Sequence, residues 1–346
     1  MSDDPETSLD PQDWAAFRKT AHALLDAAID KMETAREGRV WTPFPPQMKA
    51  AFDRPLPADG QTDSDIADRL AALLPYGVGN THPRFFGWVH GSGTPQNLLA
   101  EITAAAINAN AGGRDHGAIY VERQVIRWCR ELFGFPETAS GLIVSGTSLA
   151  TVVALKTARD ARLGFASRKA GLAGARLVGY ASAEAHACNP RAFDILGLGA
   201  DALRKIPVND RFEMDTAALR AAIAADRAAG FEPFVVIGTA GTVNAGATDP
   251  LTELADIAAA ESLWFHVDGA FGALGILVPV LAPRFAAIAR ADSLAFDFHK
   301  WLHVNYDAGC VLVRDETHHR HAFTDRPDYL KATTRGLAAG NPWPVE

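Results

Sequence analysis

Two residues that could perform covalent and electrostatic catalysis follow apolar segments in the second half of the sequence. Asp268 ends the apolar run at residues 264–267, and Lys300 comes shortly after a second run at residues 293–296. Such runs are typical of buried parallel strands, so the spacing predicts an acid at one strand end and a lysine just after the next. A lysine amine can form a Schiff base with an aldehyde, and a fixed anion can keep a ring nitrogen protonated. Pyridoxal phosphate needs both groups, and we predict Lys300 and Asp268 as its catalytic partners.

A third segment, residues 141–148, could bind an anion. GLIV at 141–144 predicts a strand, and SGTS at 145–148 leads from it into a predicted helix. In a strand-turn-helix arrangement, backbone N–H groups and hydroxyls point toward the anion and the helix dipole adds attraction. SGTS is a weak motif by itself, but beside a lysine and an acid it predicts the seat of the cofactor phosphate.

Each of these features also has an ordinary structural explanation. An acid after a strand is often a loop cap, and a His-Lys pair such as His299-Lys300 is often solvated surface. Short motifs give many false positives when they are taken singly. The functional interpretation therefore depends on the motifs occurring together and in order.

The order of the motifs resembles that of the group II pyridoxal-phosphate decarboxylases, the family of aromatic amino acid, glutamate, histidine and cysteine sulfinate decarboxylases. HVDGA at 266–270 is followed by ADS at 291–293, DFHKW at 297–301 and a VNYD-like strand at 304–307. The resemblance covers about residues 75–315, with a weaker match in the N-terminal arm. It implies a carbon-carbon lyase that uses pyridoxal phosphate.

The resemblance also implies roles for further residues. It assigns Thr147 and Ser148 to the phosphate and His299, beside the lysine, to cofactor binding. It places His186, from SAEAHAC at 182–188, flat on the cofactor ring. Such an imidazole could also hydrogen-bond the substrate carboxylate. Ala270 would form the opposite wall, because a larger side chain would collide with the ring.

The turn at residues 240–250 is similar to the family's turn whose hydroxyl lies near the phenolic oxygen of the cofactor. Thr242 could supply that hydroxyl. Some family members have a second threonine where this chain has Val243. Which hydroxyl acts therefore stays open.

A glycine-rich aromatic loop at residues 77–88 resembles the family's H-P-x-F-F segment, which forms part of the substrate pocket. Loops of this composition line sites more often than they fill cores. His82 and Phe86 are therefore predicted pocket residues. For His82, a satisfied buried histidine is an equally good interpretation.

Composition excludes several classes of protein. The 346 residues carry a formal net charge of -8 and no basic cluster, which argues against a nucleic-acid partner. The three cysteines, Cys129, Cys188 and Cys310, form no CxxC pair and fit a reducing compartment. The acidic N-terminus lacks the features of a signal peptide and no apolar run reaches the length of a membrane span, so we expect a cytoplasmic protein without membrane contact.

Alternating strand and helix patterns over residues 141–315 predict an α/β domain with a mostly parallel, doubly wound sheet. The resemblance specifies the seven-stranded type of sheet found in pyridoxal-phosphate transferase-like (fold type I) enzymes, with the cofactor at the carboxyl ends of the strands. Three acids precede predicted helices and are predicted N-caps: Asp10, Asp215 and Asp249. Gly134 is predicted to end the helix before the sheet.

We expect three regions along the chain. Residues 1–75 would form a helical arm, which either clasps a partner subunit in a homodimer, as in the resembling family, or covers its own core. Residues 76–315 would be the cofactor-binding domain. Residues 316–346 would begin a C-terminal region whose small domain in the family has no counterpart in this sequence, so we expect a fragment or a short form.

The predicted function is decarboxylation of an L-amino acid to an amine and CO2, with a mild preference for an aromatic substrate. The preference rests on Phe85, Phe86 and Trp88 in the aromatic loop. No tyrosine follows Tyr329, in the region where several family members carry a proton-donating tyrosine. Two alternatives stay open: an aldehyde synthase or other lyase on the same scaffold, and a short chain that binds cofactor without turnover.

Overall fold

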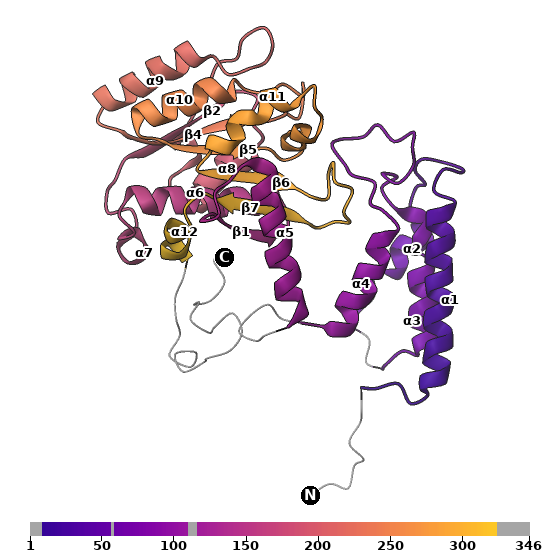
Figure 1. Cartoon of the computed structure of the whole chain (residues 1–346). Helices are drawn as coiled ribbons and strands as arrows, with labels where there is room; N and C mark the ends of the chain where they lie inside the picture. The colour runs from indigo at the N-terminus through magenta and orange to yellow at the C-terminus, as the bar shows by residue number, and fades with distance from the viewer. Residues whose placement is uncertain (1–8, 57–58, 110–115, 324–346) are drawn as a thin grey trace, which may run out of the picture. The chain divides into compact units, whose positions relative to one another are not determined.

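The computed structural model describes residues 9–56, 59–109 and 116–323. The chain forms two compact units, residues 1–98 and 99–346, which are drawn in Figure 1. Tyr329 and the rest of the region after residue 323 lie outside the described residues. None of the helices in the described ranges is both long and apolar enough to cross a membrane.

The first unit is helical. It contains α1 (Trp14–Glu33), α2 (Pro46–Ala51), α3 (Asp63–Ala71) and the short 3-10 helix η1 (Leu74–Tyr76). α1 packs against α3 and η1, yet none of its residues is fully buried. The predicted arm helix is therefore present, and its apolar side chains, among them Trp14, Phe17 and Ile29, stay exposed.

Asp13, rather than the predicted Asp10, caps α1. Its carboxylate accepts the backbone N–H groups of Ala15 and Ala16 at 2.8 and 3.1 Å. A cap must lie two or three residues before the N–H groups that it satisfies, and Asp10 is too far from the first turn. The next helix, α2, begins at a proline, and Pro46 occupies its first turn, where the missing N–H costs nothing.

The second unit is built on a seven-stranded sheet in the order β1-β7-β6-β5-β4-β2-β3. The strands are β1 (Ser140–Val144), β2 (Leu177–Ser182), β3 (Leu203–Ile206), β4 (Glu232–Thr239), β5 (Trp264–Asp268), β6 (Ser293–Asp297) and β7 (Gly309–Val313). Only β7 pairs antiparallel, and it does so with both neighbours, β1 and β6. The other six strands therefore run in one direction, and the predicted mostly parallel sheet is confirmed. The VNYD segment is not a strand, because the strand begins later, at Gly309.

Helices cover both faces of this sheet (Figure 1). One apolar layer joins the sheet to α5 (Gly117–Phe133), α9 (Thr216–Ala228), α10 (Leu251–Glu261) and η4 (Ala286–Arg290). Layers on the other face join it to α6 (Thr147–Arg162) and α8 (Cys188–Ile195). The remaining helical segments are α4 (Gln96–Ile107), α7 (Ser167–Ala170), η2 (Ala200–Ala202), η3 (Gly272–Leu277), α11 (Ala282–Phe285) and α12 (Glu316–Phe323). The arrangement is the predicted doubly wound α/β fold.

Two of the predicted helix ends in this unit are confirmed and one is wrong. Gly134 ends α5 with a left-handed φ of 68°, and Asp215 caps α9 through the N–H groups of Ala217 and Ala218. Asp249 does not cap α10. Its two carboxylate oxygens accept the backbone N–H groups of Met214 and Thr239, each at 2.8 Å, so it connects two distant segments instead.

Candidate active site

The carboxyl ends of the parallel strands lie at one edge of the sheet, where open α/β folds bind their ligands. Lys300 follows β6 at this edge, and its ammonium nitrogen lies 2.9 Å from Oδ2 of Asp297. The other oxygen of Asp297 accepts the backbone N–H of Thr147 at 2.6 Å. Asp297 therefore joins the lysine to the first residue of α6.

Asp297 is the first residue of the DFHKW motif, from which no role was predicted for it. The missed signal is its position, since it ends β6 as Asp268 ends the adjacent β5. Asp268 pairs in register with Ala295, and β6 continues two residues further to Asp297. Two buried acids thus stand at neighbouring strand ends, and one of them is paired with the lysine.

The N-terminus of α6 has the features of an anion seat. Its N-cap is Gly146, which supplies no capping side chain. The N–H of Thr147 donates to Asp297, and those of Leu149 and Ala150 donate to the carbonyl of Gly146, which leaves the N–H of Ser148 for a ligand among the described contacts. The hydroxyl of Thr147 is buried without a hydrogen-bond partner in the described chain, whereas Ser148 is exposed. An acceptor such as a phosphate oxygen would satisfy both kinds of donor.

A close backbone approach shapes this seat. A β-carbon on Gly309, the first residue of β7, would lie 2.5 Å from Cα of Gly146 and 2.8 Å from Oδ1 of Asp297. Only glycine fits at that distance, which lets the start of β7 lie directly against the beginning of α6.

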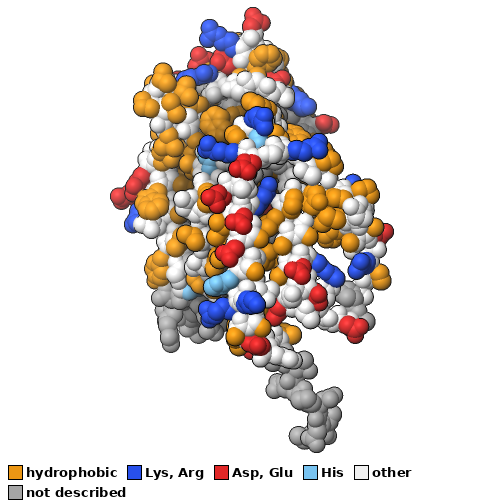
Figure 2. Space-filling model, turned by 90° about the vertical axis from the view of Figure 1, so that its right-hand side faces the viewer, with side chains coloured by type: hydrophobic (Ala, Val, Ile, Leu, Met, Phe, Trp, Pro, Cys, Tyr) orange, Lys and Arg blue, Asp and Glu red, His pale blue; other side chains and the backbone are white. Residues whose placement is uncertain are grey.

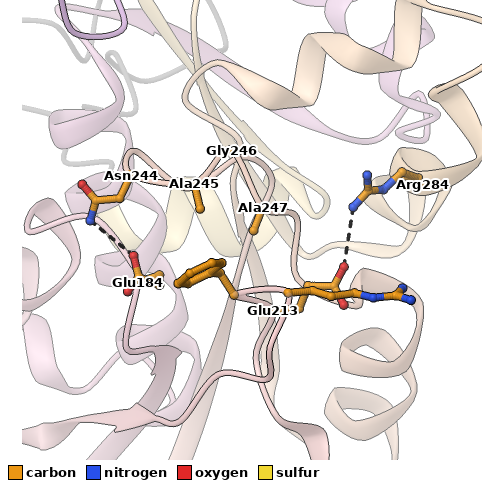
Figure 3. A pocket seen from close by; sticks show the side chains of 9 residues that line it. Glu184, Glu213, Asn244, Ala245, Gly246, Ala247 and Arg284 are labelled. Atoms are coloured by element: carbon orange, nitrogen blue, oxygen red, sulfur yellow. Dashed lines mark hydrogen bonds and ion pairs between the residues drawn. The ribbon is translucent and has the colours of Figure 1, made fainter.

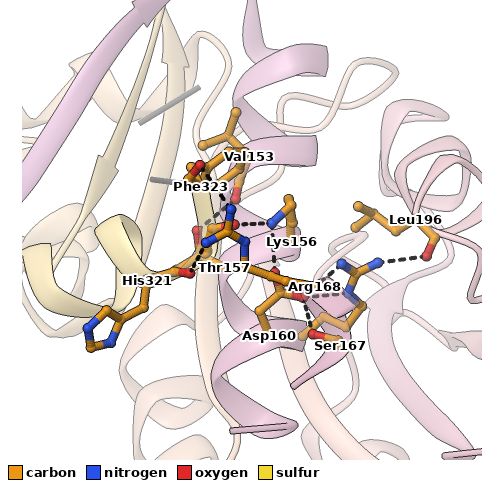
Figure 4. A network of polar contacts seen from close by, with 11 residues as sticks. Val153, Lys156, Thr157, Asp160, Ser167, Arg168, Leu196, His321 and Phe323 are labelled. Carbon is orange, nitrogen blue, oxygen red and sulfur yellow. Dashed lines mark hydrogen bonds and ion pairs between the residues drawn. The ribbon is translucent and has the colours of Figure 1, made fainter. Parts of the chain in front are cut away.

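The far half of α6 is anchored by the polar network in Figure 4. Lys156 pairs with Asp160 at 2.7 Å and also donates to the carbonyl of Ala322 at the end of α12. Asp160 is fully buried and accepts a further hydrogen bond from Ser167 at 2.7 Å. These contacts fix the helix whose first turn carries Thr147.

Asp268 is a buried acid that contacts no cationic side chain among the described residues. Only 2% of its surface is exposed, and it has no ion pair among the described residues. Its Oδ2 accepts the amide of Asn189 at 3.0 Å and lies 3.8 Å from the sulfur of Cys188, while Oδ1 accepts the N–H of Ala270 at 3.3 Å. Since burying an uncompensated carboxylate is costly, the site fits a ligand that brings a positive charge, such as a protonated pyridine ring.

His299 is buried beside the lysine. Its Nδ1 accepts the N–H of Ala308 at 2.9 Å, so a neutral ring carries its hydrogen on Nε2, 3.6 Å from Oδ2 of Asp297. Burial is the main cause that lowers the pKa of His299 below its usual value. The ring of Tyr306 stacks on it at 4.2 Å, a contact that sequence analysis did not foresee. The neutral imidazole therefore faces the carboxylate that holds Lys300.

Three other predicted residues follow the ends of neighbouring strands. His186 lies exposed after β2, and its Nδ1 accepts the N–H of Cys188 at 3.2 Å. Ala270 is partly buried after β5. Thr242 is buried after β4, where its hydroxyl accepts the N–H of Ala247 at 3.1 Å.

The contacts bring together some predicted residues and leave others apart. Asp297 contacts Lys300, His299 and Thr147. Asp268 contacts Ala270 and the start of α8, which follows His186 in sequence. Within the described ranges, no side-chain hydrogen bond or ion pair joins Thr242 or Ser148 to either group. His82 and Phe86 belong to the first unit, where His82 is buried and its Nδ1 accepts the N–H of Arg84, and Phe86 is 95% exposed.

An open polar cavity of about 860 Å³ lies near this sheet edge, lined by the segments after β2, β3 and β4 and by α11 (Figure 3). Glu184 accepts the amide of Asn244 at 3.2 Å on one side, and Glu213 lies 3.6 Å from Arg284 on the other. Both acidic groups are therefore partnered within the protein. Asp268, Asp297 and Lys300 do not line the cavity, so it is separate from the two strand-end acids and the lysine.

Comparisons with known proteins agree with this geometry. A model of the pyridoxal-dependent decarboxylase conserved domain matches residues 45–342. The aromatic-L-amino-acid decarboxylase of Bacillus atrophaeus is 37% identical over 252 residues, which are 72% of this chain and 51% of that protein. The cysteine sulfinic acid decarboxylase of Rattus norvegicus is 30% identical over 303 residues, covering 87% of this chain and 61% of that protein. The chain therefore spans about half to three fifths of the length of these two relatives.

A solved structure gives the same result for the fold. The crystal structure of Oryza sativa TDC with PLP and tryptamine matches with a TM-score of 0.85 and 25% sequence identity. The match covers 96% of this chain and 72% of the rice chain.

Proposed function

Since the chain belongs to the pyridoxal-dependent decarboxylase family, as its motifs predicted, we propose that it binds pyridoxal phosphate and decarboxylates an L-amino acid to an amine and CO2. The observation that carries the proposal is the pair of acids on β5 and β6. Asp268 is buried and has no counter-ion within the described part of the chain, and Asp297 holds the ammonium of Lys300 at 2.9 Å. When bound, the cofactor supplies an electron-accepting ring that stabilises the charge left as CO2 departs.

The donors and acceptors at the site match the polar groups of the cofactor. We assign the phosphate to Thr147, Ser148 and the N-terminus of α6, because the Thr147 hydroxyl is buried and lacks a partner in the described residues. We assign the ring nitrogen to Asp268, whose charge would keep that nitrogen protonated. Lys300 would supply the amine that reacts with the aldehyde group, and Asp297 would hold its proton.

The two faces of the ring would be covered by His186 and Ala270, with Thr242 near the phenolic oxygen and His299 beside the lysine. Because Nδ1 of His186 accepts a backbone N–H, a neutral His186 carries its hydrogen on Nε2. That hydrogen is available to a substrate carboxylate, since the side chain is exposed. His186 would therefore orient the carboxylate that is lost.

We propose an aromatic amino acid as the substrate, with His82 and Phe86 in its pocket. Phe85, Phe86 and Trp88 give the loop an aromatic composition, and Phe86 and Trp88 are 95% and 79% exposed. The relative from Bacillus atrophaeus is an aromatic-L-amino-acid decarboxylase, which supports this choice. The relative from Rattus norvegicus is a cysteine sulfinic acid decarboxylase, so cysteine sulfinate is the competing candidate substrate.

We further propose a cytoplasmic homodimer in which residues 1–75 contribute to dimerisation, residues 76–315 bind cofactor and residues 316–346 begin a C-terminal region. α1 has no fully buried residue, although Trp14 and Ile29 are large and apolar. Hydrophobic side chains also gather in several patches on the face drawn in Figure 2. Apolar surface of this kind is stabilised when a partner covers it. Light scattering tests this proposal, and a monodisperse monomer would contradict it.

CO2 release from a panel of L-amino acids tests the proposed reaction. Protein supplied with pyridoxal phosphate should release CO2 and amine from one or more aromatic amino acids faster than from cysteine sulfinate. Faster release from cysteine sulfinate would contradict the proposed substrate but not the proposed decarboxylation. Aldehyde, ammonia and peroxide in place of amine would identify an aldehyde synthase, and bound cofactor without any CO2 would refute decarboxylation.

A further inference from the structure

Asp268 is held from α8 by a single side-chain amide. Nδ2 of Asn189 lies 3.0 Å from Oδ2 of Asp268, and the two residues are 0% and 2% exposed. Among the described residues, Asn189 is the only one whose side-chain nitrogen donates to this carboxylate. The other oxygen, Oδ1, accepts only the longer backbone contact from Ala270 at 3.3 Å.

The orientation of the Asn189 amide is fixed by its surroundings. Nδ2 also donates to the carbonyl of His186 at 3.2 Å, so both of its hydrogens face acceptors. Oδ1 of Asn189 is buried and has no hydrogen-bond partner among the described residues. If the amide were rotated by 180°, that oxygen would face a carboxylate and a carbonyl, two acceptors that cannot donate to it. The amide therefore has one stable orientation, with its donor toward Asp268.

The titratable neighbours of Asp268 do not replace this donor. Burial, followed by the charge of Asp268, raises the pKa of the Cys188 thiol, so the sulfur at 3.8 Å is a neutral and weak donor. Burial lowers the pKa of His266 to about 4, so this imidazole carries no charge near neutral pH. Asp249 also interacts with Asp268 but is itself an acid, and the Lys300 ammonium is paired with Asp297.

We propose that Asn189 is a positioning residue that keeps Asp268 ionised and turned toward the ring nitrogen of the cofactor. The inference rests on the proposed function and adds a residue to which the motifs assign no role. A hydrogen bond to the charged form of a carboxylate favours that form, and its loss in a buried site favours protonation. A protonated Asp268 could no longer stabilise a positive charge on the ring. Asn189 would thus act through Asp268, without touching the reacting atoms.

The test compares Asn189→Ala with Asn189→Ser, two variants of similar volume that differ by a hydroxyl donor. The control is Asp194→Asn, at an exposed position of the same helix. Dissociation constants are measured for pyridoxal phosphate and for its 1-deaza analogue, in which carbon replaces the ring nitrogen. We expect Asn189→Ala to weaken binding of pyridoxal phosphate about tenfold and binding of the analogue by less than about twofold. Asn189→Ser should recover part of the loss, and Asp194→Asn should bind both ligands as the wild type does.

A second measurement is the pH dependence of the bound cofactor's absorbance. Its acidic transition should move upward by about one pH unit in Asn189→Ala, because the carboxylate loses a bond to its charged form. Equal weakening of both ligands with an unmoved transition would show that Asn189 only stabilises the fold. If Asn189→Ala does not fold, Asn189→Ser decides by the same criteria. Failure of the wild type to bind pyridoxal phosphate would instead refute the proposed function, and the inference with it.

Discussion

The carboxylate of Asp297 lies 2.9 Å from the ammonium nitrogen of Lys300, with only 3% of the acid's side chain exposed. Its second oxygen accepts the first N–H of α6 at 2.6 Å. One buried group therefore determines both where the lysine points and where the anion seat begins. Because Thr147 and Asp297 are 150 residues apart in sequence, their contact couples the two halves of the site.

The first prediction concerns Asp297→Asn. The amide keeps the size of the side chain, but if its oxygen accepts the Thr147 N–H, its NH2 group faces the Lys300 ammonium and no longer attracts it. We expect the free energy of unfolding to fall by about 1–3 kcal/mol and binding of pyridoxal phosphate to weaken. Urea denaturation of the apoprotein and a cofactor titration measure the two effects. Asp307→Asn, at an exposed position, is the control and should change neither.

The second prediction concerns the reactive lysine. Lys300→Ala should abolish the covalent adduct that borohydride reduction fixes between the protein and pyridoxal phosphate, because no other amine is predicted to reach the aldehyde. Mass spectrometry of the reduced protein detects the adduct. Lys205→Ala, on the exposed side of β3, should keep it. An adduct of unchanged yield in Lys300→Ala would place the reactive amine elsewhere.

Much of the fold and part of the site could be predicted from local sequence. The apolar runs before Asp268 and Lys300 predicted β5 and its neighbour β6, because a buried parallel strand is hydrophobic on both faces. The roles of Asp297 and Asn189 could not be predicted in this way. Their partners are 150 and 79 residues distant, so the contacts depend on how strands and helices are ordered in space.

Two further errors have the same physical origin. Asp249 precedes a proline and a helix, which is the local pattern of an N-cap, yet its carboxylate binds the N–H groups of Met214 and Thr239 from outside that helix. VNYD was predicted as a strand, but the chain pairs only from Gly309, where the absence of a side chain allows it to approach Gly146. In both places long-range packing decides between local alternatives.

The third prediction concerns the charge on Asp268. Asp268→Asn keeps the shape of the side chain but removes the anion that would protonate the ring nitrogen. We expect the rate of CO2 release to fall by on the order of a hundredfold or more, as in comparable electrostatic deletions. The borohydride adduct at Lys300 should still form, which separates this electrostatic effect from loss of binding. Turnover within about threefold of wild type would assign another residue to the ring nitrogen.

The fourth prediction is a pH dependence of stability that arises from His266. This imidazole is 0% exposed, its Nδ1 lies 2.8 Å from the hydroxyl of Ser293, and burial lowers its pKa from 6.5 to about 4. Between these values the unfolded chain binds a proton that the folded protein excludes. The contribution of the neutral His266 to the free energy of unfolding is therefore fully present above pH 6.5 and is lost as the pH falls toward 4. This free energy changes by at most about 1.4 kcal/mol per pH unit.

Urea denaturation of wild type and His266→Gln at several pH values measures this contribution. The difference in unfolding free energy between the two proteins should shrink as the pH falls. The contribution of Asp249 to stability depends on pH in the opposite direction. Burial raises its pKa to about 6, so this contribution decreases as the pH rises from 3.8. Taking the difference between the two proteins removes the Asp249 contribution. A difference that is constant from pH 7 to 5 would mean that His266 is protonated equally in both states.

The last prediction tests the close approach that forms the anion seat. In Gly309→Ala the new β-carbon would lie 2.5 Å from Cα of Gly146, closer than such atoms pack, so backbone at the start of α6 or β7 must move. We expect a loss of about 1–3 kcal/mol in the free energy of unfolding, as for other overpacked positions, together with weaker cofactor binding. Gly117→Ala is the matched control, since a β-carbon there meets nothing within 4 Å and Ala favours the first turn of α5. The affinity for pyridoxal phosphate should therefore fall in Gly309→Ala alone. If Gly309→Ala bound the cofactor as tightly as wild type, the start of α6 would not be the phosphate seat.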